Sequence, residues 1–235
     1  MMVMYQQKKQ ISIYLVLLML TVSILPVSAQ GITTRSKAVV SFQTKKDSYY
    51  NRSSDVLANF SYQMPQLKGS SVVVKEINAS IKKDYKTALK NKKRCFDYAK
   101  DATSEYRGGE FYTKTSCKVS YNYGGYVSFK FHSKWMAGGV GNIWTYGLTY
   151  DLKTGKKLNV SDVISGNNQS VKQKIIKGYC SQITDNEYAR SEIRDTKISK
   201  FQFYLKDGKV KVCFGPYQPG GGNGESQISL TGNYR

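Results

Sequence analysis

One long segment of the chain repeats an apolar residue every four positions, and this spacing limits what the segment can form. The repeat builds a single apolar stripe on a helix of about 3.6 residues per turn. It consists of Val73, Ile77, Ile81, Tyr85 and Leu89. The lysines that flank it are typical of a solvated face. The pattern predicts a helix from about Ser71 to Lys100, with one face available for burial.

A second, shorter amphipathic helix is predicted by Val171, Ile175, Tyr179 and Ile183. Most of the remaining chain alternates apolar and polar residues, which is the pattern of half-buried strands. The expected strands cover residues 38–45, 57–62, 111–123, 126–131, 144–150, 201–205, 210–214 and 227–230, and we expect the second of them to end near Pro65. Gly124-Gly125 and Asp207-Gly208 are turn signals, the latter typical of a two-residue hairpin. The order predicts an α+β fold of antiparallel sheets packed with one long and one shorter helix.

The first 29 residues have the features of a cleavable secretory signal peptide. Lys8 and Lys9 precede an apolar run, and Val27-Ser28-Ala29 places small residues before a cut between Ala29 and Gln30. An uncleaved signal anchor is the alternative, because the apolar run is at the lower limit of a bilayer span. We expect a secreted or extracytoplasmic protein, retained at the cell wall or released. No second long apolar run occurs, so we expect no membrane span in the mature chain.

The chain is strongly basic, with 36 Lys and Arg against 16 Asp and Glu and a formal net charge of +20. Cleavage of the leader would lower this charge by two. Such a surface attracts polyanions. Outside a bacterial cell these are anionic wall polymers and anionic lipids, and nucleic acid would bind only non-specifically. The lysines are spread along the chain, so the sequence alone does not locate a site.

Four cysteines, an even number, lie after the leader, and in an oxidising compartment this favours two disulfides. The preferred pairing is Cys95 with Cys117 and Cys180 with Cys213, because each pair then joins a helix to a nearby strand. Each bridge would stabilise the fold by about 3 kcal/mol in the chain-entropy model. A zinc site is the weaker alternative, since no Cys-x-x-Cys spacing occurs and His132 is the only histidine.

The sequence offers few groups for catalysis. His132 is the one imidazole, and its place in a strand favours a structural role over that of a general base. We expect no cofactor, no metal and no enzymatic activity. A carboxylate-based glycan hydrolase is the alternative, and its candidate acids are Glu187, Glu192 and Asp195. Nineteen tyrosines could stack on sugars or single-stranded nucleic acid, although cross-strand pairing is the preferred interpretation.

Several motifs, in order, resemble a bacterial extracytoplasmic domain pair of the RsiV/PdaC type. The segment 62–69 (YQMPQLKG) and Asn78 are similar to the first part of that pair, and segments 150–156 (YDLKTGK), 160–164 (VSDVI) and 214–218 (FGPYQ) to the second. The residues that match are Tyr62, Pro65, Asn78, Asp151, Gly155, Asp162, Pro216 and Tyr217. The resemblance implies a PdaC-like strand-helix part over 30–106 and an RsiV-like α+β part over 107–235, packed as one unit. Gln218 stands where the family has an acid.

The resemblance also implies a binding module rather than an enzyme. We therefore expect a secreted or wall-associated, non-enzymatic module of the bacterial envelope that recognises an anionic wall polymer or an extracellular protein. The first alternative is a lysozyme-binding protein like the RsiV ectodomain. Charge argues against it, because a basic lysozyme would be repelled by a basic partner. The second alternative is a hydrolase that acts on peptidoglycan.

Overall fold

The structure, a computed structural model, describes residues 37–102, 110–221 and 224–234. The expected leader and its cleavage site at Ala29 and Gln30 lie outside the described residues. Among the described helices, none combines the length and the apolar character that crossing a membrane requires.

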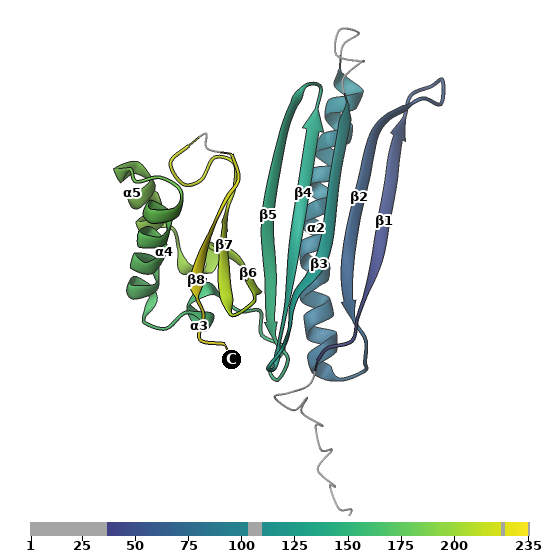
Figure 1. Cartoon of the computed structure of the whole chain (residues 1–235). Coiled ribbons are helices and arrows are strands. Elements are labelled where there is room, and N and C mark those ends of the chain that lie inside the picture. Colours follow the sequence, from purple (N-terminus) through teal and green to yellow (C-terminus); the bar gives the residue numbers. More distant parts are fainter. Residues whose placement is uncertain (1–36, 103–109, 222–223, 235) are drawn as a thin grey trace, which may run out of the picture. The chain divides into compact units, whose positions relative to one another are not determined.

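A five-stranded sheet carries the long helix (Figure 1). Its strands are β1 (Val40–Tyr50), β2 (Val56–Leu67), β3 (Phe111–Tyr123), β4 (Tyr126–Ala137) and β5 (Val140–Asp151), in the spatial order β1-β2-β3-β4-β5. Helix α2 (Val72–Asp101) connects β2 to β3 and lies along one face of the sheet. All neighbouring strands are antiparallel except β2 and β3, which run parallel. A parallel pair needs such a crossover connection. The sheet combines β1 and β2, which precede the expected boundary at residue 106, with β3, β4 and β5, which follow it.

Helix α2 matches the helix predicted over 71–100. The Ser71 hydroxyl caps it by accepting a hydrogen bond from the backbone N–H of Val74 at 3.3 Å. Ile77 and Ile81 of its apolar stripe are buried against the sheet, in one cluster with Phe129 and Phe131. Burial of this stripe orients α2 on the sheet. The lysines on the other side of the helix are exposed to solvent.

The prediction that the second strand ends near Pro65 is wrong, since β2 continues to Leu67. The physical reason lies in the pairing. β2 pairs with β3 only over Asn59–Tyr62, so beyond Tyr62 it has a single neighbour, β1. Pro65 therefore lies where β2 is effectively an edge, and there proline is tolerated.

A second sheet of three antiparallel strands follows, formed by β6 (Gln202–Lys206), β7 (Lys209–Phe214) and β8 (Ser226–Thr231). Asp207 and Gly208 both have positive φ, at 50° and 73°, in the predicted hairpin turn. The helices are α3 (Val160–Val163), α4 (Asn168–Gln182), α5 (Glu187–Asp195) and the 3-10 turn η2 (Ile198–Lys200). Helix α4, the predicted second amphipathic helix, buries Val171, Ile175 and Tyr179 in the core of this part. Together these elements confirm the α+β class.

The two sheets meet where β6 crosses β4 and β5. The backbone N–H of Leu205 donates to Ser128 Oγ at 2.9 Å, and Ser128 Oγ lies 2.8 Å from Thr149 Oγ1. Ser128 and Thr149 are buried. Gly147 of β5 faces the backbone of Phe203, so the absence of a side chain permits this close approach.

Candidate functional site

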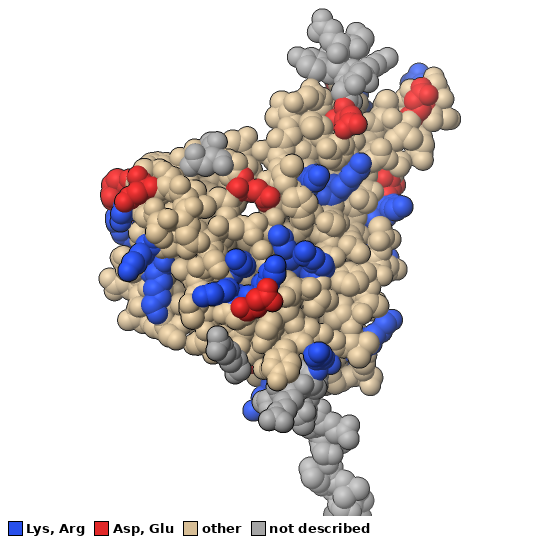
Figure 2. All heavy atoms as spheres, viewed as in Figure 1, with Lys and Arg blue, Asp and Glu red and all other residues tan. Residues whose placement is uncertain are grey.

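The face of the five-stranded sheet opposite α2 carries five lysines from three strands. Because side chains alternate along a strand, one face of β3 and β4 lies under α2. The other face is covered by β6 around Ser128 and is open further along, around Lys114 and Lys134. The open face carries Lys46, Lys114, Lys118, Lys130 and Lys134, which we call the lysine face. Figure 2 shows more basic than acidic side chains on the visible face of the molecule, with single acidic groups between them.

The lysines of β3 and β4 stand directly opposite one another. Lys114 pairs in register with Lys134, and Lys118 pairs with Lys130. Like charges directly across two strands destabilise a sheet. Among the described residues, none of the ion pairs involves these four lysines. Lys114 Nζ lies 4.5 Å from the ring centroid of Tyr112, and Lys130 Nζ lies 5.1 Å from that of Tyr204. These aromatic rings offset part of the repulsion, but none of the described ion pairs neutralises the charge of the four lysines.

No carboxylate from β1 to β4 reaches this face in the described chain. β2, β3 and β4 contain no Asp or Glu, and Asp47 of β1 points to the other side, where Lys92 of α2 donates to its Oδ2 at 2.6 Å. This bond holds the pKa of Asp47 below its usual value. No carboxylate of strands β1 to β4 therefore neutralises the lysines of this face.

A hollow of about 320 Å³ opens at the centre of the lysine face, where β2 and β3 separate. Their parallel pairing stops at Tyr62 and Thr115, and the Gln63 side chain spans the gap by accepting from the backbone N–H of Cys117 at 2.9 Å. The hollow is lined by Thr44, Ser61, Gln63, Lys114, Thr115, Ser116, His132 and Lys134. Ammonium, hydroxyl and amide groups together can donate several hydrogen bonds to one anion.

His132 therefore lies in a polar hollow of an exposed sheet face, beside two lysines. Its Nδ1 is 3.4 Å from Thr145 Oγ1. Sequence reasoning did not connect this histidine with the lysines, because Lys114 and His132 become neighbours only through strand pairing. Lysines that alternate with uncharged residues in 111–134 indicate that the lysines of each strand share one face, and this was the signal available in the sequence.

Of the residues that carry the family resemblance, Tyr62, Asn78, Asp151, Gly155 and Asp162 have structural roles. Tyr62 is fully buried, and Asn78 pins α2 to the end of β2 by bonding both backbone groups of Leu67 at 2.9 Å. The turn after β5 is held by Asp151 Oδ1, which accepts from two backbone N–H groups, and by Gly155 at a positive φ of 74°. Asp162 caps α3. Pro65 lies within β2, and Pro216 and Tyr217 lie in the loop after β7, where Tyr217 is 63% exposed.

The two predicted disulfides are not formed, and all four cysteines are free. Cys95 Sγ lies 4.0 Å from the carbonyl oxygen of Met136, which is opposite Tyr112 on β3. Cys117 is five residues further along β3, a distance of about 16 Å along a strand. A disulfide requires Cα atoms within about 7 Å.

The second pair is separated by the small sheet itself. Val212 and Phe214 face the core with α4, so Cys213 between them faces the opposite side, near Lys130. Cys180 belongs to α4 and lies near Asp185. The prediction assumed that a helix and the next strand place their cysteines toward each other, and the strand register places them apart.

We expect the thiols to differ sharply in reactivity toward iodoacetamide at pH 8. Burial raises the pKa of Cys95 to about 11 and that of Cys213 to about 12, and burial together with Asp84 raises the pKa of Cys117. Only Cys180 is partly exposed, and it should be alkylated first, with the others reacting only after unfolding. Mass spectrometry of timed samples measures this order. If the cysteines of the unfolded protein are not alkylated in the absence of a reductant, they form disulfides, and this result would contradict the expectation.

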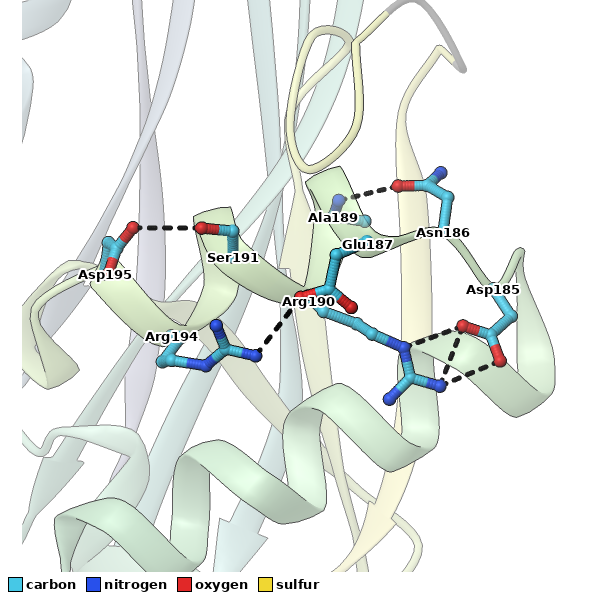
Figure 3. A network of polar contacts seen from close by, with 8 residues as sticks. All are labelled: Asp185, Asn186, Glu187, Ala189, Arg190, Ser191, Arg194 and Asp195. Atoms are coloured by element: carbon cyan, nitrogen blue, oxygen red, sulfur yellow. Dashed lines mark hydrogen bonds and ion pairs between the residues drawn. The ribbon is translucent and has the colours of Figure 1, made fainter.

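The carboxylates proposed for a hydrolase lie on and beside α5, a helix that the sequence patterns did not predict (Figure 3). Arg190 pairs with Asp185 at 2.8 Å, Arg194 pairs with Glu187 at 3.5 Å, and Ser191 donates to Asp195 at 3.3 Å. Glu192 Oε2 accepts from the backbone N–H of Gly220 at 3.1 Å. Each acid thus holds a cation, a hydroxyl or a loop, and they do not converge on one hollow.

Comparison with known proteins shows a partial family match and a likeness of fold. The family model described as deacetylase PdaC matches residues 51–140, fewer than half of the chain. A DUF3298 family member from Bacteroides fragilis NCTC 9343 superposes with a TM-score of 0.57 at 12% identity, over 84% of this chain and 91% of that one. A DUF3298 family protein from Pseudomonas aeruginosa PAO1 gives 0.56 at 11% identity, over 84% and 92%. No curated protein matches the sequence. At such identities the similarity concerns the fold.

Proposed function

We propose that this protein is a non-enzymatic binding module of the bacterial envelope that holds an anionic wall polymer on its lysine face. The observation that carries the proposal is the pair of opposed lysine pairs, Lys114 with Lys134 and Lys118 with Lys130, on a face without carboxylates in the described strands β1 to β4. A repeating phosphate or carboxylate chain removes their mutual repulsion. The unbound protein bears a cost that the ligand relieves.

The surface fits a polymer better than a compact anion. The lysines extend along β3 and β4 and across to Lys46 of β1 rather than forming one closed pocket. The hydroxyl-lined hollow with His132 gives this open surface one recessed point. Secretion and retention at the wall are part of the proposal, and they rest on the expected leader and on the charge of the chain.

Recognition of a basic extracellular protein such as lysozyme is the weaker candidate. It requires a free acidic patch, and the acids around α5 are matched by Arg190 and Arg194. A glycan hydrolase requires two carboxylates that face a common substrate. The contacts of Glu187, Glu192 and Asp195 favour structural roles instead.

We expect purified poly(glycerol phosphate) to bind, with an affinity that falls steeply as salt rises. Changing Lys114, Lys118, Lys130 and Lys134 together to Gln should weaken binding by about 100-fold or more, since a lysine near an anionic surface contributes on the order of 1 kcal/mol. Titration calorimetry between 50 and about 300 mM salt measures both effects.

The matched control removes the same charge from the solvent face of α2, by changing Lys82, Lys83, Lys86 and Lys90 to Gln. These four side chains are exposed, whereas Lys130 of the lysine-face variant is half-buried against the Tyr204 ring. Circular dichroism and urea denaturation of both variants check that each is folded before binding is measured. An equal loss in the two variants would mean that net charge alone attracts the polymer, and the lysine face would not be the site. Binding of lysozyme at physiological salt, without polymer binding, would favour the other candidate.

A further inference from the structure

A second recess lies on the other face of the five-stranded sheet, between α2 and the strands β4 and β5. It consists of three adjoining hollows of about 240, 310 and 470 Å³. The first two share Asn91 and Trp144, and the last two share Trp135. We call the whole recess the tryptophan groove, and its main lining residues are Asp84, Asn91, Arg94, Trp135, Asn142 and Trp144.

The fold leaves this groove open because α2 covers only part of the sheet. The helix packs over β2 and β3, whereas β5 is an edge strand. Asp84, Asn91 and Tyr98 recur at seven-residue spacing and so form one wall along α2. From Asp84 to Tyr98 this wall is about 21 Å long, which is enough for several sugar units.

Both tryptophans of the chain lie in the groove. Trp135 and Trp144 are half-buried, and Trp135 meets the Tyr98 ring edge-on at a centroid distance of 6.3 Å. Tyr146 lies deeper and stacks on Phe131 at 4.8 Å. Aromatic rings that are partly open and partly held by neighbours offer flat apolar faces at low cost in side-chain entropy.

The floor of the groove is polar rather than apolar. Thr113, Thr115 and Ser133 line its first hollow and are 4%, 7% and 2% exposed, with Thr115 Oγ1 and Ser133 Oγ at 2.9 Å. Asn91 and Asn142 add side-chain amides to these three hydroxyls along the recess. Thr115 and Ser133 already satisfy each other, and each hydroxyl keeps a further lone pair that can accept from a ligand.

Asp84 is a fixed acceptor at one end of the groove. Tyr62 and Tyr146 donate to its Oδ2 at 2.6 and 2.8 Å. Burial and the carboxylate raise the pKa of both phenols, so they remain protonated donors. A carboxylate can accept about four hydrogen bonds, which leaves capacity for hydroxyls of a ligand.

We propose that the tryptophan groove binds an extended, uncharged oligosaccharide. Sugar rings present apolar C–H faces that stack on indole, and a rim of hydroxyls that pairs with amides and carboxylates. Arg94 is accompanied by Asp84 and Asp101 along the recess, so the lining has no excess of positive charge. A neutral glycan and the polyanion would thus occupy opposite faces of one sheet, with Thr115 bordering a hollow on each face.

Tryptophan fluorescence tests the proposal directly, because both indoles lie in the proposed site. Chitohexaose, cellohexaose and mannohexaose are titrated into the full mature chain. We expect a saturable change with one or more of them, and the responding sugar identifies the stereochemistry that the groove accepts. Unchanged fluorescence with all three overturns the proposal.

Variants assign the signal to the groove. Trp144→Ala should weaken binding measured by calorimetry about tenfold, and Asn91→Ala with Asn142→Ala should weaken it while retaining both indoles. The lysine-face variant should bind the sugar normally, so failure of one site is separable from failure of the other. Full affinity in both groove variants would place the sugar elsewhere and would also overturn the proposal.

Discussion

Gly147→Ala is expected to destabilise the fold by about 3 kcal/mol or more, an effect at the upper end for overpacking. A methyl group at this position overlaps the carbonyl oxygen of Phe203 and lies 2.8 Å from Cβ of Tyr204. These are atoms of a strand in another sheet and cannot rotate away. The sheets must separate, which also strains the bond from Leu205 N–H to Ser128 Oγ.

Gly178→Ala is the matched control. A methyl group there approaches Leu230 Cδ2 at 2.8 Å and Ile228 Cδ1 at 3.2 Å. Both are ends of side chains that can shift, and alanine is favoured over glycine in a helix such as α4. Urea denaturation of both variants measures the difference. Equal stabilities would show that the β5–β6 crossing is not as close as described.

Alkaline pH is expected to unfold the protein steeply through its buried tyrosines. Burial is the main reason that the folded pKa values of Tyr62, Tyr146 and Tyr150 lie above the usual value near 10. Below pH 10 both states keep the phenolic protons, so the full stability is present. Above it the unfolded chain loses protons that the folded chain retains, and each such tyrosine lowers the free energy of unfolding by about 1.4 kcal/mol per pH unit.

Tyr150→Phe isolates one of these contributions. The side chain is fully buried, and its hydroxyl donates to Ser80 at 3.1 Å. The variant should be somewhat less stable at pH 8 because this bond is lost. Its stability should nevertheless fall less between pH 10 and 11, by about 1 kcal/mol, because the unfolded phenol is only half ionised at pH 10. Tyr217→Phe, at a 63% exposed position, should leave the slope unchanged. Parallel slopes in wild type and Tyr150→Phe would contradict the expectation.

The elements of this fold were largely predictable from local pattern. The four-residue period of Ile77 and Ile81 identified α2, and the alternation from Phe111 to Tyr123 matched β3. Asp207-Gly208 identified its hairpin. Helix α5 was not predicted, because its charged residues mask a short apolar face of Ala189 and Ile193.

The candidate sites were not predictable in the same way. The number of lysines predicted a basic surface, but their spread along the chain did not locate it. Nothing in the sequence indicated that Trp135 and Trp144 line the same groove. The cysteine pairing was wrong for the same reason, since it depends on which side of a strand each residue faces once sheets have packed.

The sequence by itself determined helices α2 and α4, most strands and the strongly basic character, because these depend on residues close together in the chain. Only the tertiary structure decided that β2 and β3 run parallel, that Lys114 stands opposite Lys134, and that α2 leaves β5 uncovered. Each of these features depends on contacts between segments that are distant in the chain, such as those of α2 with β2, β3 and β4. The long apolar stripe therefore predicted a helix, and its packing decided which surfaces remain open for ligands.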